Sequence, residues 1–115
     1  MKYILLIHVD EKAYQAASQP EAERRLAGYM TYAAALVQAG AMVAGDRLQP
    51  TASASTVRVT AGKTQVLDGP YAETKEQLGG YFIIDVPDLD AALSWAARCP
   101  GASDGAIEVR PIWQM

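Results

Sequence analysis

Histidine and cysteine are almost absent from this chain, which limits the chemistry it can carry. Its 115 residues include one cysteine, one histidine and one phenylalanine. The single cysteine, Cys99, excludes an internal disulfide and a cysteine-based metal centre, and the single histidine, His8, excludes a histidine-rich metal site. The chain also lacks the glycine-rich phosphate-binding motifs and the HExxH motif of zinc hydrolases. We therefore expect neither a metal nor a cofactor.

Excess positive charge and long apolar runs are missing as well. The formal net charge is -3, so no basic face is available for the phosphates of nucleic acid. The longest apolar run near the start, residues 3–7, is far shorter than the roughly 20 residues that cross a bilayer. That run also lacks the flanks of a signal peptide. We expect one domain over residues 1–115, located in the cytoplasm, with no nucleic-acid or membrane partner.

The remaining pattern predicts an α+β domain. Ser18 with Glu21 forms a capping box that begins a helix ending at Gly40, and Asp88 caps a second helix that ends near Cys99. Alternating or continuous apolar residues predict strands over residues 2–9, 41–45, 79–86 and 106–113, and a hairpin formed by residues 56–60 and 64–67. This order, β-α-β-(hairpin)-β-α-β, is close to the split βαβ pattern of ferredoxin-like folds. We therefore predict a ferredoxin-like sandwich with an added hairpin.

The first helix carries two stripes at helical spacing. The more hydrophobic stripe is expected to face the core; it contains Ala22, Leu26, Met30, Ala33 and Val37. The second stripe contains Arg25, Tyr29, Tyr32 and Leu36. Its tyrosines could complete the edge of the core, or they could line a ligand cavity with an apolar ring and a polar tip.

Both faces of the predicted sheet are partly apolar. In the first strand Ile4 and Leu6 share a face with His8, opposite the face expected to lie under the helices, and Ile83 and Ile112 occupy the corresponding face of later strands. An antiparallel sheet with one wet face shows clean alternation instead. The sequence therefore predicts a homodimer in which the faces without helices meet.

Four segments of the chain resemble one known family over nearly the whole length. They are KYILLIHVDE, AGAMVAGDRLQP, DGPYAETKEQLGGYFIIDVPDLDAALSWA and IEVRPI. Together they are similar to the YCII-related family, and specifically to its DGPF-domain branch, although Tyr71 stands where that branch usually has Phe. The resemblance implies a ferredoxin-like subunit that forms a dimeric α/β barrel.

What the resemblance implies about activity is open. Members look like cousins of small cofactor-free enzymes such as muconolactone isomerases, whereas some DGPF relatives are encoded beside sigma-factor genes. A His–Asp pair is proposed for some YCII-type proteins, with its histidine on the first helix. That helix has Tyr29 and Tyr32 here and no histidine, so the pair does not transfer as it stands.

His8 is the candidate general base of the chain. Histidine is the side-chain type whose ordinary pKa lies near neutrality, and His8 stands near the end of its strand. Asp46, at the end of the second strand, could orient the imidazole for proton abstraction beside a carbonyl. Tyr71 or Tyr81 could donate a hydrogen bond to developing negative charge. The alternative is a half-exposed histidine at the end of a strand with no catalytic role.

The segment from Asp68 to Tyr71 predicts a tight turn, since Asp accepts local backbone hydrogen bonds, Gly permits positive φ and Pro fixes its own φ. This turn could border a pocket, or it could be purely structural. We expect an unknown small molecule to bind between the end of the first strand, Tyr29 and Tyr32, and this turn. Two functions remain open: a cofactor-free isomerase or lyase acting on a small carbonyl or carboxylate compound, and a non-catalytic ligand-binding or regulatory module linked to transcription.

Overall fold

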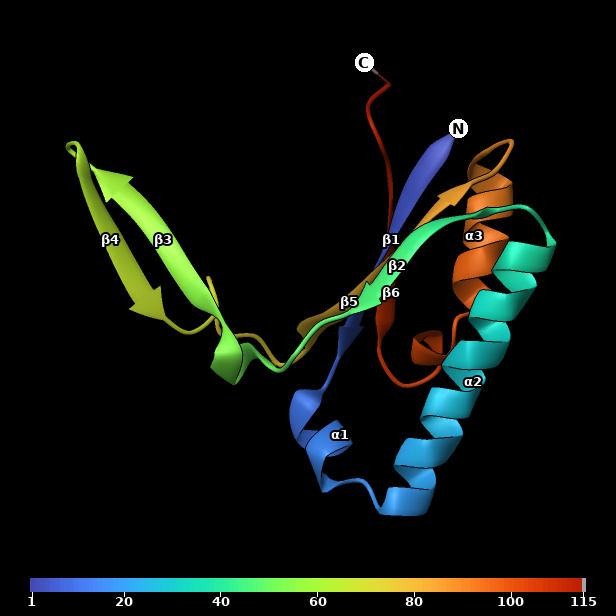
Figure 1. The fold of residues 1–115 in the computed structure, drawn as a ribbon, viewed down its shortest axis with the longest axis horizontal. Coiled ribbons are helices and arrows are strands. Elements are labelled where there is room, and N and C mark those ends of the chain that lie inside the picture. The colour runs from blue at the N-terminus through green and yellow to red at the C-terminus, as the bar shows by residue number, and fades with distance from the viewer. Residues whose placement is uncertain (115) are drawn as a thin grey trace.

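The computed structural model describes residues 1–114, and its body is a four-stranded antiparallel sheet with helices on one face (Figure 1). The strands follow the order β2-β5-β1-β6. Their bounds are β1 Lys2–Val9, β2 Met42–Arg47, β5 Gln77–Asp85 and β6 Ala106–Pro111. The helices are α1 Glu11–Ala16, α2 Gln19–Gln38 and α3 Leu89–Arg98, with 3-10 turns at Thr51–Ser53 and Pro100–Ala102. The predicted α+β class is confirmed, and the strand order is consistent with a ferredoxin-like fold.

The core lies between this sheet and the helices α2 and α3. Successive side chains of a strand point to opposite faces, and in β1 this places Tyr3, Leu5, Ile7 and Val9 under the helices, where all four are buried. Phe82 and Ile84 of β5 extend the same layer, and one contiguous cluster of buried side chains results. Within residues 1–114, no helix combines the length and the apolar character needed to cross a membrane.

The helix α2 begins as predicted but buries the other stripe. Ser18 is its N-cap, and the Ser18 hydroxyl accepts a hydrogen bond from the Glu21 amide. The buried residues are Tyr32 and Leu36, whereas Leu26, Met30 and Val37 are exposed. The prediction that the more hydrophobic stripe faces the core was therefore wrong.

Tyr32 explains why the less hydrophobic stripe packs inward. Its hydroxyl donates a hydrogen bond of 2.6 Å to the carbonyl of Trp95, so the ring can be buried without leaving a polar atom unpaired. The ring packs edge-on against Phe82 and Trp95, with centroids 5.3 and 6.0 Å away. Such aromatic pairs stabilise beyond the area they bury.

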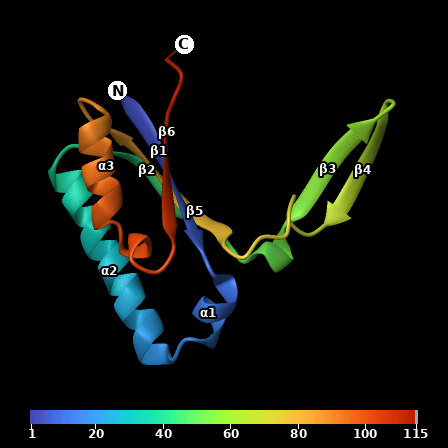
Figure 2. The ribbon, with the colours of Figure 1, turned by 180° about the vertical axis from the view of Figure 1, so that it is seen from behind.

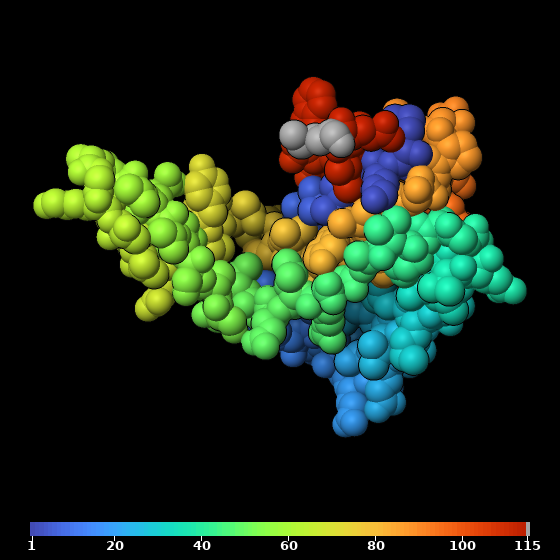
Figure 3. Space-filling view, turned by 45° about the horizontal axis from the view of Figure 1, so that its top comes forward, coloured from blue at the N-terminus to red at the C-terminus, as the bar shows by residue number. Residues whose placement is uncertain are grey.

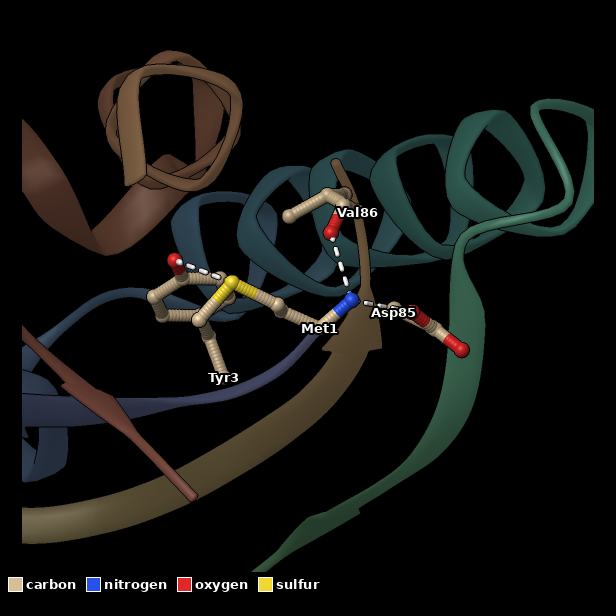
Figure 4. A network of polar contacts seen from close by, with 4 residues as sticks. All are labelled: Met1, Tyr3, Asp85 and Val86. Atoms are coloured by element: carbon tan, nitrogen blue, oxygen red, sulfur yellow. Dashed lines mark hydrogen bonds and ion pairs between the residues drawn. The ribbon is translucent and has the colours of Figure 1, made fainter. Parts of the chain in front are cut away.

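Polar contacts form at both ends of β1. The helix α1, which the sequence patterns did not predict, is capped by Asp10, whose carboxylate accepts from the Ala13 amide. At the other end of the sheet, the amino group of Met1 donates to Asp85 Oδ1 at 3.0 Å and to the Val86 carbonyl at 2.9 Å (Figure 4). These two contacts join the beginning of β1 to the end of β5.

The predicted hairpin forms and projects away from the body (Figures 1 and 2). It consists of β3 Ser55–Thr60 and β4 Lys63–Asp68, which form a separate two-stranded sheet. We call these residues, 55–68, the arm. Its turn is Ala61–Gly62, with φ of 51° and 76°; positive φ at both positions is typical of a type I′ turn, whose twist matches that of the strands. In the space-filling view the arm stands clear of the sheet and helices (Figure 3).

A carboxylate fixes the base of the arm to the body. Glu11 accepts hydrogen bonds from the Thr51 amide at 2.8 Å and from the Thr51 hydroxyl at 2.7 Å. The Glu11 amide itself donates to the side chain of Gln77, the first residue of β5. These contacts hold the chain entering the arm against the start of α1.

Candidate functional site

The face of the sheet that the helices leave uncovered, which we call the open face, carries both apolar and titratable side chains. The register of the strands aligns them in rows across the sheet. One row runs Asp46, Tyr81, Leu6, Glu108, and the next runs Ala44, Ile83, Ile4, Arg110. Ile4, Leu6 and Ile83 are half-buried and form an apolar floor at the centre of this face.

His8 lies at one end of the open face and contacts Glu108. Its Nε2 atom is 3.3 Å from Glu108 Oε1, and both side chains are partly exposed. The residue opposite His8 on β6 is the small Ala106, and β5 has a register shift beside His8, where Gly79 is unpaired. The imidazole therefore contacts a carboxylate of β6, and its direct neighbours across the strands are Ala106 and Leu78.

A second polar pair lies on the other side of the floor. The Tyr81 hydroxyl donates a hydrogen bond of 2.8 Å to Asp46 Oδ2. This hydrogen bond and the negative charge of Asp46 raise the pKa of Tyr81. The phenol is therefore protonated at neutral pH, and its proton is directed at Asp46.

The structure does not bring Asp46 to His8 as the sequence reasoning expected. Asp46 lies on β2 and His8 on β1, and β5 runs between these two strands. Two strand spacings amount to about 10 Å, before the offset along the strands is added. Glu108 is the carboxylate that reaches the imidazole, because β6 is a direct neighbour of β1.

Tyr29 and Tyr32 lie on the helix-covered side of the sheet, not on the open face. Tyr32 is part of the core, and burial raises the pKa of its phenol. Burial, followed by the neighbouring Cys99 thiol, raises the pKa of Tyr29. The sheet therefore separates both tyrosines from His8, and the three do not share a site within one subunit.

Comparison with known proteins places the whole chain in one family. The model of the YCII-related domain matches residues 1–115. The chain belongs to the YCII-related family. An uncharacterized protein of Rhizobium meliloti (strain 1021) is 43% identical over 114 residues, which cover 97% of this chain and 92% of that protein. The family membership expected from the sequence is thus confirmed.

In this YCII-related chain the turn from Asp68 to Tyr71 belongs to the base of the arm. Asp68 is the last residue of β4 and pairs with Ser55. The Gly69 amide donates to the Ala54 carbonyl, and Thr56 donates to the Gly69 carbonyl. Tyr71 is 77% exposed, and its ring lies 5.0 Å from the Arg58 guanidinium. Among residues 1–114, no hydrogen bond joins this turn to His8.

Two open hollows of the described residues lie away from His8 in this YCII-related subunit. One is an open depression where the first residues of the chain lie near residues 112–114. It is lined by Met1, Lys2, Asp85, Ile112, Trp113 and Gln114. The other is formed by residues 47–50, at the exit of β2. Residues 1–114 contain no group of three carboxylate, thiol or imidazole side chains placed to hold a metal ion. We therefore take the two polar pairs on the open face, His8 with Glu108 and Tyr81 with Asp46, as the candidate functional site.

Proposed function

We propose that the open face is covered by a second copy of the chain, and that a small molecule binds between the two faces. The support is the apolar floor: Ile4, Leu6 and Ile83 are only half-buried in one subunit, and so is Ile112, which directly follows β6. Two sheets that pack face to face lie about 10 Å apart and bury such side chains against each other. A homodimer would turn the open face into the lining of a shared interior.

The chemistry of this site comes from His8 and Glu108. A neutral imidazole can take a proton from a carbon beside a carbonyl and return it elsewhere on the same molecule. A carboxylate that accepts a hydrogen bond from the other ring nitrogen stabilises the imidazolium formed. The observation that carries the proposal is the contact of 3.3 Å between His8 Nε2 and Glu108 Oε1 beside an apolar floor. Glu108 takes the orienting role that the sequence reasoning gave to Asp46.

The spacing of the two polar pairs suits a small substrate. Tyr81 and Glu108 stand on strands that flank β1, so the pairs lie about 10 Å apart across Leu6. Apolar floor and convergent polar groups are the usual lining of small-molecule sites. We therefore propose a cofactor-free enzyme of isomerase or lyase type that acts on a small carbonyl or carboxylate compound.

Proton transfer can be tested before the substrate is known. The protein would be incubated in deuterated water with a set of small keto acids, lactones and unsaturated carboxylates, and NMR would follow exchange of the protons next to each carbonyl. We expect exchange of at least one compound to be catalysed, to be lost in His8→Ala, and to fall about 10- to 100-fold in Glu108→Gln. Glu23→Gln is the matched control, because it neutralises an exposed carboxylate of α2 on the other side of the sheet and leaves both polar pairs in place.

The results separate the two functions that the sequence left open. Exchange that survives His8→Ala would contradict the assignment of His8 as the base. Compounds that raise the melting temperature of the protein without any exchange would favour the non-catalytic ligand-binding or regulatory module over the enzyme.

A further inference from the structure

We propose that the arm of each subunit clasps the second copy, packing an apolar face of its own against that copy. Residues that pair across a hairpin share a face, and in the arm Val57 pairs with Val66 while Val59 pairs with Thr64. The three valines therefore lie together on one face, where they are 58%, 65% and 61% exposed. We call this the valine face; it also carries Thr64 and, at the base of the arm, the Ser55–Asp68 pair.

The opposite face of the arm has a different character. It carries the pairs Thr56–Leu67, Arg58–Gln65 and Thr60–Lys63, so one long apolar side chain stands among polar ones. A ribbon that is apolar on one side and polar on the other normally buries its apolar side. A two-stranded hairpin is also only marginally stable in water without a third strand or a packed surface. The valine face thus lacks a cover within its own subunit.

The dimensions of the subunit indicate how large that cover must be. The Cα radius of gyration is 16.0 Å, against about 13 Å for a compact chain of this length. The accessible surface is 8004 Å², which is about 1,900 Å² more than a compact monomer of 12.3 kDa exposes. Two copies that each buried this excess would bury about 3,800 Å², within the range of obligate homodimers. The excess accessible surface therefore matches the area that a second copy of the chain would bury.

The arm is also placed to reach a copy that covers the open face. In Figure 1 the helices lie on one side of the sheet and the arm extends on the other, and Figure 2 shows the same arrangement from behind. Glu11 holds Thr51 through two hydrogen bonds, and the Leu48 amide donates to the Gly79 carbonyl at 2.9 Å. The base of the arm is thus attached to the body at two points. This inference rests on the proposed function only in its requirement for a dimer through the open face.

Conservative substitutions can separate the arm from the rest of the interface. In V57T/V59T/V66T each valine becomes a β-branched residue of similar size that still favours a strand. We expect the dimer dissociation constant, measured by sedimentation equilibrium, to rise about 100-fold or more. The matched control is Leu67→Thr, because Leu67 is 59% exposed and lies on the opposite face. That control should leave the constant within about 3-fold of the unchanged protein.

A second measurement uses the unchanged protein and does not depend on how a variant folds. Amide hydrogen exchange at β3 and β4 should be slow in the dimer and should accelerate when the protein is diluted below its dissociation constant. Rapid exchange of the arm in the intact dimer would overturn the clasp.

The outcomes distinguish this inference from the proposed function. A dimer that V57T/V59T/V66T leaves unchanged overturns the clasp, while a dimer through the open face stands. Introducing a charge at the floor, in Leu6→Lys, tests that face independently and should produce a monomer. A wild-type protein that is monomeric at micromolar concentration overturns both.

Discussion

The strands β1 of the body and β3 of the arm both carry apolar residues at alternate positions, but their surroundings are very different. In β1 every second residue is buried, from Tyr3 to Val9. In β3 the alternation of Val57 and Val59 with polar residues is as clear, yet none of its residues is buried. Alternation thus predicts that a segment is a strand and which side chains share a face. It does not say which surface will cover that face, because the cover can belong to another element or to another chain.

The largest expected difference between the two regions is the cost of removing a leucine. Leu36 is fully buried in the body, so Leu36→Ala should lower the free energy of unfolding by about 2–5 kcal/mol through lost burial and the cavity left behind. Leu67 lies on the polar face of the arm, and Leu67→Ala should change it by no more than about 0.5 kcal/mol. Urea denaturation at one fixed protein concentration measures both.

The comparison fails if the two substitutions cost the same. An equally large loss for Leu67→Ala would mean that the polar face of the arm is the buried one, and that the valine face is not its docking side.

A smaller effect is expected from alkaline pH, and it should originate in the body. Burial raises the pKa of the Tyr29 and Tyr32 phenols and of the Cys99 thiol above their ordinary values of 10.0 and 9.0. The folded state therefore keeps protons that the unfolded state would release. The stability from these groups is complete below about pH 9 and is lost as the pH rises through the raised values.

Denaturation between pH 7 and pH 11 checks this effect. Unfolding should become easier above about pH 9, and Tyr29→Phe should reduce the slope because one of the ionising groups is gone. A slope that Tyr29→Phe leaves unchanged would show that this phenol does not contribute.

The smallest effect concerns the turn of the arm. Ala61 has a φ of 51°, a conformation that is unfavourable for alanine and that asparagine adopts more readily. Ala61→Asn would create the Asn-Gly pair preferred in type I′ turns. It should stabilise the arm by about 0.5–1 kcal/mol, which would be seen as slower amide exchange in β3 and β4 with no change in β1.

The matched control for this substitution lies next to it. Gly62 has a φ of 76°, so Gly62→Ala should accelerate exchange in the same two strands. Equal changes in the arm and the body would contradict the view that the arm opens independently.

Much of the fold could be predicted because its signals are local. Ser18 and Asp88 each precede a helix and cap it as expected, and the four strands of the body and the hairpin form near their predicted positions. The orientation of α2 could not be predicted from hydrophobicity, which ranks Leu26 and Met30 above Tyr32. The choice depends on the carbonyl of Trp95, which is 63 residues away in the chain and accepts the tyrosine proton.

The site was harder to predict because its pairs join distant strands. His8 and Glu108 are 100 positions apart, and only the strand order makes them neighbours. The predicted ferredoxin-like topology did contain the needed signal: it sets the first strand beside the last one and separates it from the second. Applied to His8, that order favours Glu108 over Asp46. The direction in which the arm projects from the body, by contrast, cannot be predicted from the local sequence pattern.

The connection that carries the arm has a consequence for how such chains can diversify. The strands β2 and β5 are direct antiparallel neighbours, and the hydrogen bond from Leu48 to Gly79 extends their pairing toward the arm. A short loop could therefore replace residues 50–76 without altering the ladder. The arm is thus an insertion between two strands that already pair with each other. If the arm contacts a second copy as proposed, gene duplicates that kept the sheet and changed only this segment would acquire different partner preferences, and each could avoid mixed assemblies with the other.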